Sequence, residues 1–244
     1  MATTKGQRIG IWVIAGTMMI GTVGGFVAMM VAPGNQAREQ AELQKAQDEY
    51  TAALQEYQKK VTEQNEQYDA AINAKVAELG LNEKYAAEFS GYASRVSAFN
   101  KDEVTELKTE DLKVGDGEEI KDDSNVAMYY IGWNPTGEVF DQSIDGDKLK
   151  NPLPLDGVGT ASVIEGWRKG LIGMKIGGVR ELTIPAAQAY GEQGSGEKIP
   201  ANTPLKFVVM AIPSLGVKKP ETIPEPEAPK IVKDFYKRNY GYDL

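Results

Sequence analysis

The sequence predicts an α+β domain that follows a membrane-spanning helix and a long helical stalk. Three observations lead to this prediction. An uncharged apolar run occupies residues 9–32, a region rich in helix-forming residues follows it, and short alternating runs separated by turn residues begin after Lys101. The 244 residues are enough for one domain with extensions. We therefore divide the chain into five segments: 1–8, 9–32, 33–101, 102–216 and 217–244.

The composition excludes several classes of function. The chain contains no Cys and no His, which rules out disulfides, thiolate nucleophiles and imidazole acid-base chemistry. We expect neither a metal ion nor another cofactor. The net charge of −8 provides no basic surface for phosphate backbones, so nucleic acid is not an expected partner.

The apolar run at residues 9–32 predicts an anchor in the membrane. As a helix its 24 residues would span about 36 Å, enough to cross a hydrocarbon core of about 30 Å. A cleaved signal peptide is the alternative, but the apolar region of such peptides is usually about 7 to 15 residues long. Lys5 and Arg8 precede the run, so the positive-inside rule places residues 1–8 in the cytoplasm. We expect a single-pass protein of the cell membrane whose C-terminal domain is extracytoplasmic.

The stalk, residues 33–101, is predicted to be helical. Residues 35–79 contain no Pro and no interior Gly, which favours one long helix. Gln47 and Gln64 interrupt its apolar stripe, which consists of Leu43, Tyr50, Leu54, Tyr57, Val61, Tyr68 and Ala71. A weak coiled coil, and with it a homodimer through the stalk, fits this stripe as well as a helical hairpin does. After Gly80 a second stripe predicts a second helix that folds back on the first, through Tyr85, Phe89, Tyr92, Val96 and Phe99.

The segment 102–216 shows the alternation that is typical of half-buried antiparallel strands. Such strands are predicted at residues 125–131, 179–184 and 205–212, with a short helix at 163–171 between the first two. The result is a curved sheet over one small helix. The segment 217–244 begins with four prolines within fourteen residues, which favours an extended strap. Its last part, 231–240, fits a short amphipathic helix, although ten residues are few for a helix that stands alone.

A series of motifs then narrows the identity of the domain. Tyr130-Ile-Gly132 is followed by Gly137-Glu-Val-Phe-Asp141-Gln-Ser143, and later by the run Val163-Ile-Glu-Gly-Trp-Arg-Lys-Gly-Leu-Ile-Gly-Met-Lys-Ile-Gly-Gly178. The run Arg180-Glu-Leu-Thr-Ile-Pro185 comes next, with further matches at 189–191, 199–200 and 205–207. In order and spacing this series resembles the FKBP family of peptidyl-prolyl cis-trans isomerases.

The resemblance implies a half-barrel sheet wrapped over the short helix, with an apolar cleft that binds the proline of an X-Pro peptide. It makes Trp167 the floor of the cleft and supplies the walls from Tyr130, Phe140, Val163, Ile164 and Phe207. It also gives Ile164 a backbone N–H for the substrate, Tyr190 a phenol hydroxyl, and Asp141 a place near the twisting amide, although Asp141 alone would equally fit a turn cap. The residues expected to act in catalysis are Tyr130, Asp141, Trp167 and Tyr190, with Phe140, Leu153, Val163, Ile164, Lys198, Ile199 and Phe207 binding the substrate.

Three positions depart from the family pattern. Leu153 stands where an aromatic residue is common, which predicts weaker stacking on the substrate. Lys198 stands where an apolar residue often precedes Ile199, so it either favours acidic residues beside the proline or points to solvent. Ser195 occupies the variable loop over the cleft. The resemblance therefore leaves the affinity for macrolides open.

The expected function is an isomerase that accelerates folding of exported, proline-containing polypeptides at a bacterial cell surface. This chemistry needs no nucleophile, metal or proton acceptor, in agreement with the composition. One alternative is a membrane-tethered chaperone or binding module, which would expose the stripe of Tyr85, Phe89 and Tyr92. Another is a structural protein of the cell envelope, which loss of Trp167, Tyr130 or Asp141 would have indicated.

Overall fold

The computed structural model describes residues 35–241. The described chain forms two compact units. One consists of residues 68–219, and the other of residues 35–67 together with 220–241. The long helix α2 (Asn35–Glu78) contributes residues to both units. Its bounds confirm the single helix that was predicted for residues 35–79.

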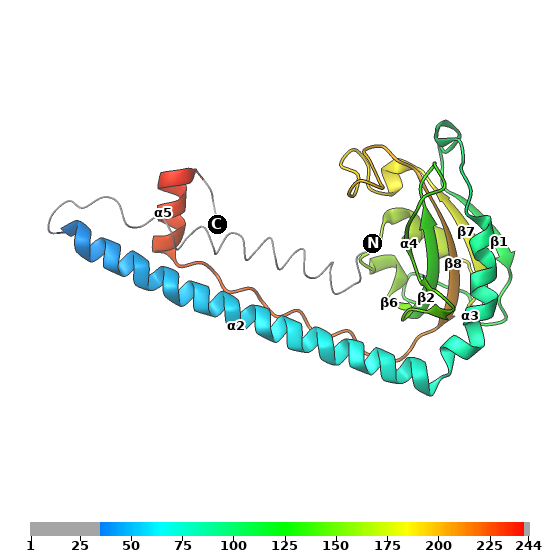
Figure 1. The fold of residues 1–244 in the computed structure, drawn as a ribbon, viewed down its shortest axis with the longest axis horizontal. Coiled ribbons are helices and arrows are strands. Elements are labelled where there is room, and N and C mark those ends of the chain that lie inside the picture. Colours follow the sequence, from blue (N-terminus) through cyan, green and yellow to red (C-terminus); the bar gives the residue numbers. More distant parts are fainter. Residues whose placement is uncertain (1–34, 242–244) are drawn as a thin grey trace. The chain divides into compact units, whose positions relative to one another are not determined.

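The larger unit is built on one antiparallel sheet (Figure 1). Its strands lie in the order β1 (Lys108–Lys113), β7 (Val179–Ile184), β8 (Leu205–Pro213), β2 (Val126–Trp133) and β3 (Val139–Gln142), and β6 (Leu153–Leu155) also pairs with β2. A separate hairpin joins β4 (Ile144–Asp145) to β5 (Lys148–Leu149). The three predicted strands and the antiparallel sheet are thereby confirmed.

The inner face of the sheet packs against the short helix α4 (Glu165–Leu171), as the sequence predicted. Side chains alternate between the two faces along each strand, so Met128, Leu182 and Val209 lie on this inner side with Trp167 and Leu171 of α4. All five are buried in one apolar cluster. This cluster carries most of the residues that the motifs single out.

The outer face of the sheet is also covered, which corrects the prediction of half-buried strands. The last turns of α2 and the helix α3 (Leu81–Gly91) pack on it, and Figure 1 draws α3 and α4 on opposite sides of the sheet. A second apolar cluster forms there from Ile72, Leu81 and Phe89 of the helices and from Tyr129, Trp133 and Met210 of the strands. Seven of the eight residues of β2 are therefore buried. Successive side chains along each strand therefore alternate between two covered apolar faces, and not between an apolar face and a solvent-exposed one.

The second stripe follows a different path from the predicted one. The helix α3 ends at Gly91, a 3-10 helix spans Tyr92–Arg95, and the backbone is extended at Val96. This extended segment lies against the β2–β3 turn, because Trp133 Nε1 donates to Ser97 O (3.0 Å) and Phe99 N donates to Pro135 O (3.0 Å). The stripe therefore buries its apolar side in the outer cluster of the sheet, which removes it from water.

The smaller unit pairs the first part of α2 with the C-terminal segment. The extended strap, residues 220–229, runs along α2 (Figure 1), and Gln64 Nε2 donates to Glu221 O (3.0 Å). The helix α5 (Lys230–Tyr240) follows, with Val232 buried and Arg238 4.0 Å from Glu39. This confirms the strap and the terminal helix. Within this unit the segment beside α2 is therefore the strap rather than the second helix of a hairpin, and a coiled coil with a second chain stays a prediction.

The predicted anchor at residues 9–32 and the predicted cytoplasmic segment 1–8 lie outside the described residues. Of the helices between residues 35 and 241, none has the length and apolar character to cross a membrane.

Candidate functional site

Four aromatic rings from four different elements meet on the inner face of the sheet. Trp167 of α4 lies edge-on to Tyr130 of β2 and to Phe207 of β8, with 5.4 Å between ring centroids in both pairs. Phe140 of β3 lies edge-on to Phe207 at 5.5 Å. We call these four residues the aromatic cluster. Perpendicular contacts of this kind suit the ring quadrupoles, so the cluster is a rigid apolar surface.

The close approach of Phe140 and Phe207 depends on Gly132 of β2. Gly132 pairs with Phe207 on one neighbouring strand and with Asp141 on the other. A Cβ atom at this position would lie 2.5 Å from Phe207 Cε1 and 2.7 Å from Phe140 Cζ. Only a residue without a side chain leaves both rings in place, which explains the Gly of the Tyr-Ile-Gly motif.

Exposure within the cluster is uneven. Trp167 is 3% exposed and Phe207 is 4% exposed, whereas Tyr130 and Phe140 are only partly buried. Leu153, Val163 and Ile164 are also partly buried, and Ile199 packs against the same core at 4% exposure. The structure therefore brings the predicted floor and the predicted wall residues together. A buried Trp surrounded by partly exposed apolar side chains can bind a small apolar ring.

A polar pair lies at the edge of the aromatic cluster. Tyr130 Oη donates a hydrogen bond to Asp141 Oδ2 (2.7 Å), and Asp141 Oδ1 accepts from the backbone N–H of Gln142 (3.0 Å). The sequence left two readings of Asp141 open, a turn cap and a group beside the aromatic residues. In the structure Asp141 lies within β3 and beside the aromatic cluster, so the turn cap is not the reading that the structure favours.

Ser143 holds Tyr130 in place, and the sequence reasoning did not assign it this role. Its hydroxyl accepts from Tyr130 N (3.0 Å), and its N–H donates to Tyr130 O (2.7 Å). Ser143 is almost fully buried at 2% exposure. In the sequence, only its position two residues after Asp141 in the motif marked Ser143 as a candidate. The neighbouring residues give no indication that its hydroxyl would contact β2.

Ile164 begins α4 and presents the predicted backbone donor. Its backbone is extended (φ −58°, ψ 151°), and it is the N-cap residue of the helix. Among residues 35–241 the Ile164 N–H has no backbone acceptor, although its carbonyl accepts from Trp167 N (3.0 Å). Amide groups at a helix N-terminus carry partial positive charge, so this group is suited to a carbonyl oxygen of a ligand.

Two predicted site residues are exposed. Tyr190 lies after the 3-10 helix Ala186–Gln188 and is 40% exposed, far more than the aromatic cluster. Lys198 is also exposed, but it does not simply point to solvent. Its ammonium lies 3.1 Å from the Glu138 carboxylate and donates to Val139 O (3.0 Å). The expected attraction for acidic residues is therefore opposed by Glu138.

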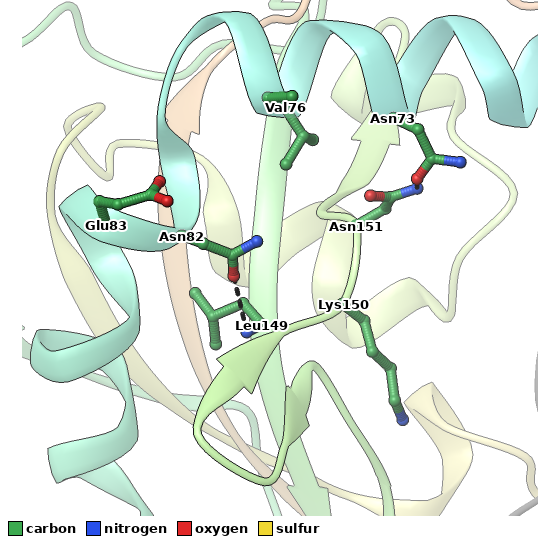
Figure 2. A pocket seen from close by; sticks show the side chains of 8 residues that line it. Asn73, Val76, Asn82, Glu83, Leu149, Lys150 and Asn151 are labelled. Atoms are coloured by element: carbon green, nitrogen blue, oxygen red, sulfur yellow. Dashed lines mark hydrogen bonds between the residues drawn. The ribbon is translucent and has the colours of Figure 1, made fainter.

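A hollow of about 520 Å³ lies between the end of α2, the start of α3 and the β4–β5 hairpin (Figure 2). Asn82 Oδ1 accepts from Leu149 N there (2.8 Å), and Asn73 contacts Asn151 (2.8 Å). None of the sequence-predicted site residues lines this hollow. Its lining is mostly polar and its hydrogen bonds serve to hold the hairpin on the helices, so we assign the functional site to the aromatic cluster instead.

Known proteins share the region that carries this site. A family model for FKBP-type peptidyl-prolyl cis-trans isomerases matches residues 116–212. The chain is 41% identical over 103 residues to the FK506-binding protein of Neisseria meningitidis serogroup A, which covers 42% of this chain and 91% of that protein. It is 44% identical over 103 residues to FK506-binding protein 4 of Rhizopus delemar, which covers 42% of this chain. The chain spans only 26% of the length of that fungal protein.

Among solved structures, the peptidyl-prolyl cis-trans isomerase of Pseudomonas syringae pv. tomato also matches part of this chain. It is 28% identical, with a TM-score of 0.38, and the match covers 59% of this chain and 92% of that chain.

Proposed function

Because the chain belongs to the family of FKBP-type peptidyl-prolyl cis-trans isomerases, we propose that the aromatic cluster binds the proline ring of a polypeptide and catalyses rotation about the preceding peptide bond. The observation that carries this proposal is the position of Trp167, buried at 3% exposure and met edge-on by Tyr130 and Phe207. A proline ring is apolar and rigid, so it can stack on such a surface at little entropic cost. Proline-containing polypeptides are the substrates this chemistry implies.

Catalysis of this rotation rests on differential binding. The barrier is about 18–20 kcal/mol because rotation breaks the amide resonance. An apolar surface lowers the barrier by removing water from the carbonyl and by holding the twisted amide more tightly than the planar one. The Ile164 N–H is free to donate a hydrogen bond to a substrate carbonyl, while the Tyr130–Asp141 pair offers a polar edge beside the twisting bond. No covalent intermediate is required.

We further propose that the enzyme is a membrane-anchored bacterial protein that acts on exported polypeptides outside the cytoplasm. The support is the uncharged run at residues 9–32, preceded by Lys5 and Arg8. Slow X-Pro steps take tens to hundreds of seconds unaided, so exported chains would benefit from such an enzyme.

The chaperone alternative receives no support from the aromatic stripe. Phe89 is 0% exposed, and Tyr85 and Tyr92 pack against the outer cluster of the sheet. A stripe that is used for folding the domain is not available for binding unfolded chains. A homodimer through the stalk is likewise unsupported by any exposed stripe, because the strap lies beside α2 within the smaller unit.

The test is a prolyl-isomerisation assay with proline-containing tetrapeptides and the full chain in detergent. Trp167→Ala and Asp141→Ala should each lower kcat/KM by roughly tenfold or more, because each removes a group that contacts the substrate. Leu79→Ala, a change at a 46% exposed position, is the control and should leave the rate unchanged. Equal rates for the parent and for the uncatalysed reaction would refute the isomerase proposal. Competition by a macrolide in the same assay would measure the affinity that Leu153 leaves open.

The topology can be tested separately because the chain has no Cys. Ser214→Cys and Thr4→Cys place single thiols in the segments 102–216 and 1–8. A membrane-impermeant maleimide applied to intact cells should label the first variant and leave the second unlabelled. The reverse pattern would place the domain in the cytoplasm.

A further inference from the structure

Asn134 is a buried polar residue that the proposed chemistry does not use. It is 6% exposed and begins the turn between β2 and β3. Its Oδ1 accepts three hydrogen bonds, from Thr136 N (3.0 Å), Thr136 Oγ1 (2.7 Å) and Glu138 N (3.1 Å). Its backbone completes the turn, with Asn134 N donating to Glu138 O (3.1 Å). One side-chain oxygen therefore organises residues 134–138.

The nitrogen of the same side chain makes a contact far away in the sequence. Asn134 Nδ2 donates to Lys198 O (2.9 Å), across a separation of 64 residues. The Lys198 side chain reaches back in the opposite direction, to Val139 O (3.0 Å) and to the Glu138 carboxylate (3.1 Å). We call this pair of crossing contacts the clamp. It joins the turn 134–138 to the loop 194–200.

The loop that is clamped has its own internal shape. Ser195 N donates to Ile199 O (2.7 Å), and Gly194 has a positive φ of 66°. A Cβ at Gly194 would lie 2.4 Å from Ile199 O, so the loop closes tightly on itself at this point. One internal hydrogen bond closes this loop, so its order also depends on what holds it from outside.

The clamp adjoins Ile199, a residue of the candidate site. Ile199 follows Lys198 directly and packs in the same core cluster as Trp167 and Phe207. The turn at the other end of the clamp leads into β3, which carries Phe140 and Asp141. Residues on both sides of the clamp thus belong to the candidate site. A wall that is fixed before the substrate arrives costs no ordering entropy on binding.

We propose that Asn134 is a positioning residue, which holds the loop 194–200 against the β2–β3 turn so that Ile199 forms a fixed wall of the site. The predicted effect of Asn134 on catalysis rests on the proposed function. The clamp itself is a structural feature and does not depend on that function. It assigns to the carboxamide two separable tasks. The oxygen folds the turn, and the nitrogen holds the loop.

Asn134→Asp separates these tasks. The aspartate retains an oxygen for the three donors of the turn, but when ionised it has no donor for Lys198 O. Two acceptors then face one another, so the loop should detach while the turn persists. A protonated aspartate regains a donor, and burial raises the pKa of such a carboxyl group. Lowering the pH should therefore restore the clamp in this variant.

The full chain in detergent is used for two measurements. At pH 7.5 the variant should show kcat/KM lowered by roughly threefold to tenfold, mainly through a higher KM, because one hydrogen bond to the wall is lost. The ratio of variant to parent activity should rise towards one as the pH falls to 5. Protonation would relieve a purely global loss of stability as well, so hydrogen exchange is needed to separate a local effect on the loop from a global one.

Hydrogen exchange provides a readout that does not depend on activity. In Asn134→Asp the Ser195 amide should exchange at least about tenfold faster, while the Thr136 and Glu138 amides keep their protection. Lys198→Met, a change at an exposed side chain, removes the second half of the clamp and should accelerate the Ser195 amide to a smaller extent. If Asn134→Asp fails to fold, the Lys198→Met result decides the question.

Unchanged Ser195 exchange in the folded variants would overturn the clamp. Faster exchange with unaltered kcat/KM would overturn its role in the site. If the parent chain does not isomerise tetrapeptides, the proposed function fails, and the exchange data still support or overturn the clamp.

Discussion

Tyr129 and Tyr130 are consecutive residues of β2 whose side chains lie on opposite faces of the sheet. Tyr129 is fully buried on the outer face, with its ring 6.0 Å from Phe89 and 6.2 Å from Tyr85 of α3. Tyr130 lies on the inner face, 5.4 Å from Trp167, and its hydroxyl donates to Asp141. One strand thus joins the helical cover of the domain to the candidate site. The pair provides matched substitutions in which only a hydroxyl is removed.

Tyr130→Phe should lower kcat/KM by roughly threefold to tenfold, because Asp141 loses its partner at the edge of the aromatic cluster. Tyr129→Phe should leave the rate within about twofold of the parent, because its hydroxyl is remote from the inner face. Initial rates with one proline-containing tetrapeptide suffice for this comparison. Equal effects of the two substitutions would contradict the assignment of the inner face as the active one.

Tyr129→Phe should instead raise the free energy of unfolding by about 1 kcal/mol. The Tyr129 hydroxyl is buried and has no hydrogen-bond partner among the described residues, so its removal relieves a desolvation cost. Urea denaturation followed by circular dichroism measures the change. A loss of stability would indicate that the hydroxyl is satisfied in solution.

The same substitution should change the alkaline limb of the stability curve. Burial raises the pKa of Tyr129 above its ordinary value of 10.0, with a smaller contribution from Tyr85. The unfolded chain therefore releases this proton first, so stability is fully present below about pH 10 and falls as the pH rises further. Phe at this position has no proton to lose. Between pH 9 and 11 the unfolding free energy of Tyr129→Phe should fall less steeply than that of the parent, and parallel curves would contradict the buried, protonated phenol.

Phe89→Ala should destabilise the larger unit by about 3–5 kcal/mol, because it empties a fully buried site between α3 and β2. Leu79→Ala is the matched control, since Leu79 is 46% exposed and its truncation should change stability by no more than about 0.5 kcal/mol. Both changes in the free energy of unfolding are measured from the midpoints of urea denaturation curves that have equal m-values. A small effect of Phe89→Ala would mean that α3 does not remain on the sheet in solution.

Truncated fragments test whether the helices on the outer face of the sheet stabilise the domain. A fragment that begins at Lys101 lacks α3 and the end of α2, so it exposes Tyr129, Trp133 and Met210. Its melting temperature should lie roughly 10 °C or more below that of a fragment that begins at Tyr68, because three large apolar contacts from Ile72, Leu81 and Phe89 are lost. Equal melting temperatures would show that the outer face is stable without its helices.

Glu138→Gln should increase the preference for an acidic residue before proline. The substitution removes the carboxylate 3.1 Å from the Lys198 ammonium and leaves a net positive charge at the rim of the site. We expect the ratio of kcat/KM for Glu-Pro over Ala-Pro peptides to rise about twofold at low ionic strength, and the gain to disappear in 1 M salt. Lys198→Met in the same background should abolish the gain. An unchanged ratio would show that Lys198 does not reach the substrate.

Much of the local structure could be predicted from the sequence. The absence of Pro and Gly between residues 35 and 79 indicated the helix α2, and alternation indicated the strands β2, β7 and β8, because both signals arise from backbone preference and from side-chain periodicity within one segment. The motifs around Tyr130, Asp141 and Trp167 likewise indicated a set of residues that the structure brings together at one site. A single segment carries all the information that such inferences need.

What covers each apolar face was decided only in the tertiary structure. The stripe of Tyr85, Phe89 and Tyr92 showed that one side is apolar, but it packs on the sheet rather than on α2, and the strap takes the place beside α2. Asn134 organises its own turn through contacts to Thr136 and Glu138, yet its bond to Lys198 O spans 64 residues. The reason is physical: periodicity specifies that a surface must leave water, whereas its partner depends on the competing surfaces that the whole chain offers.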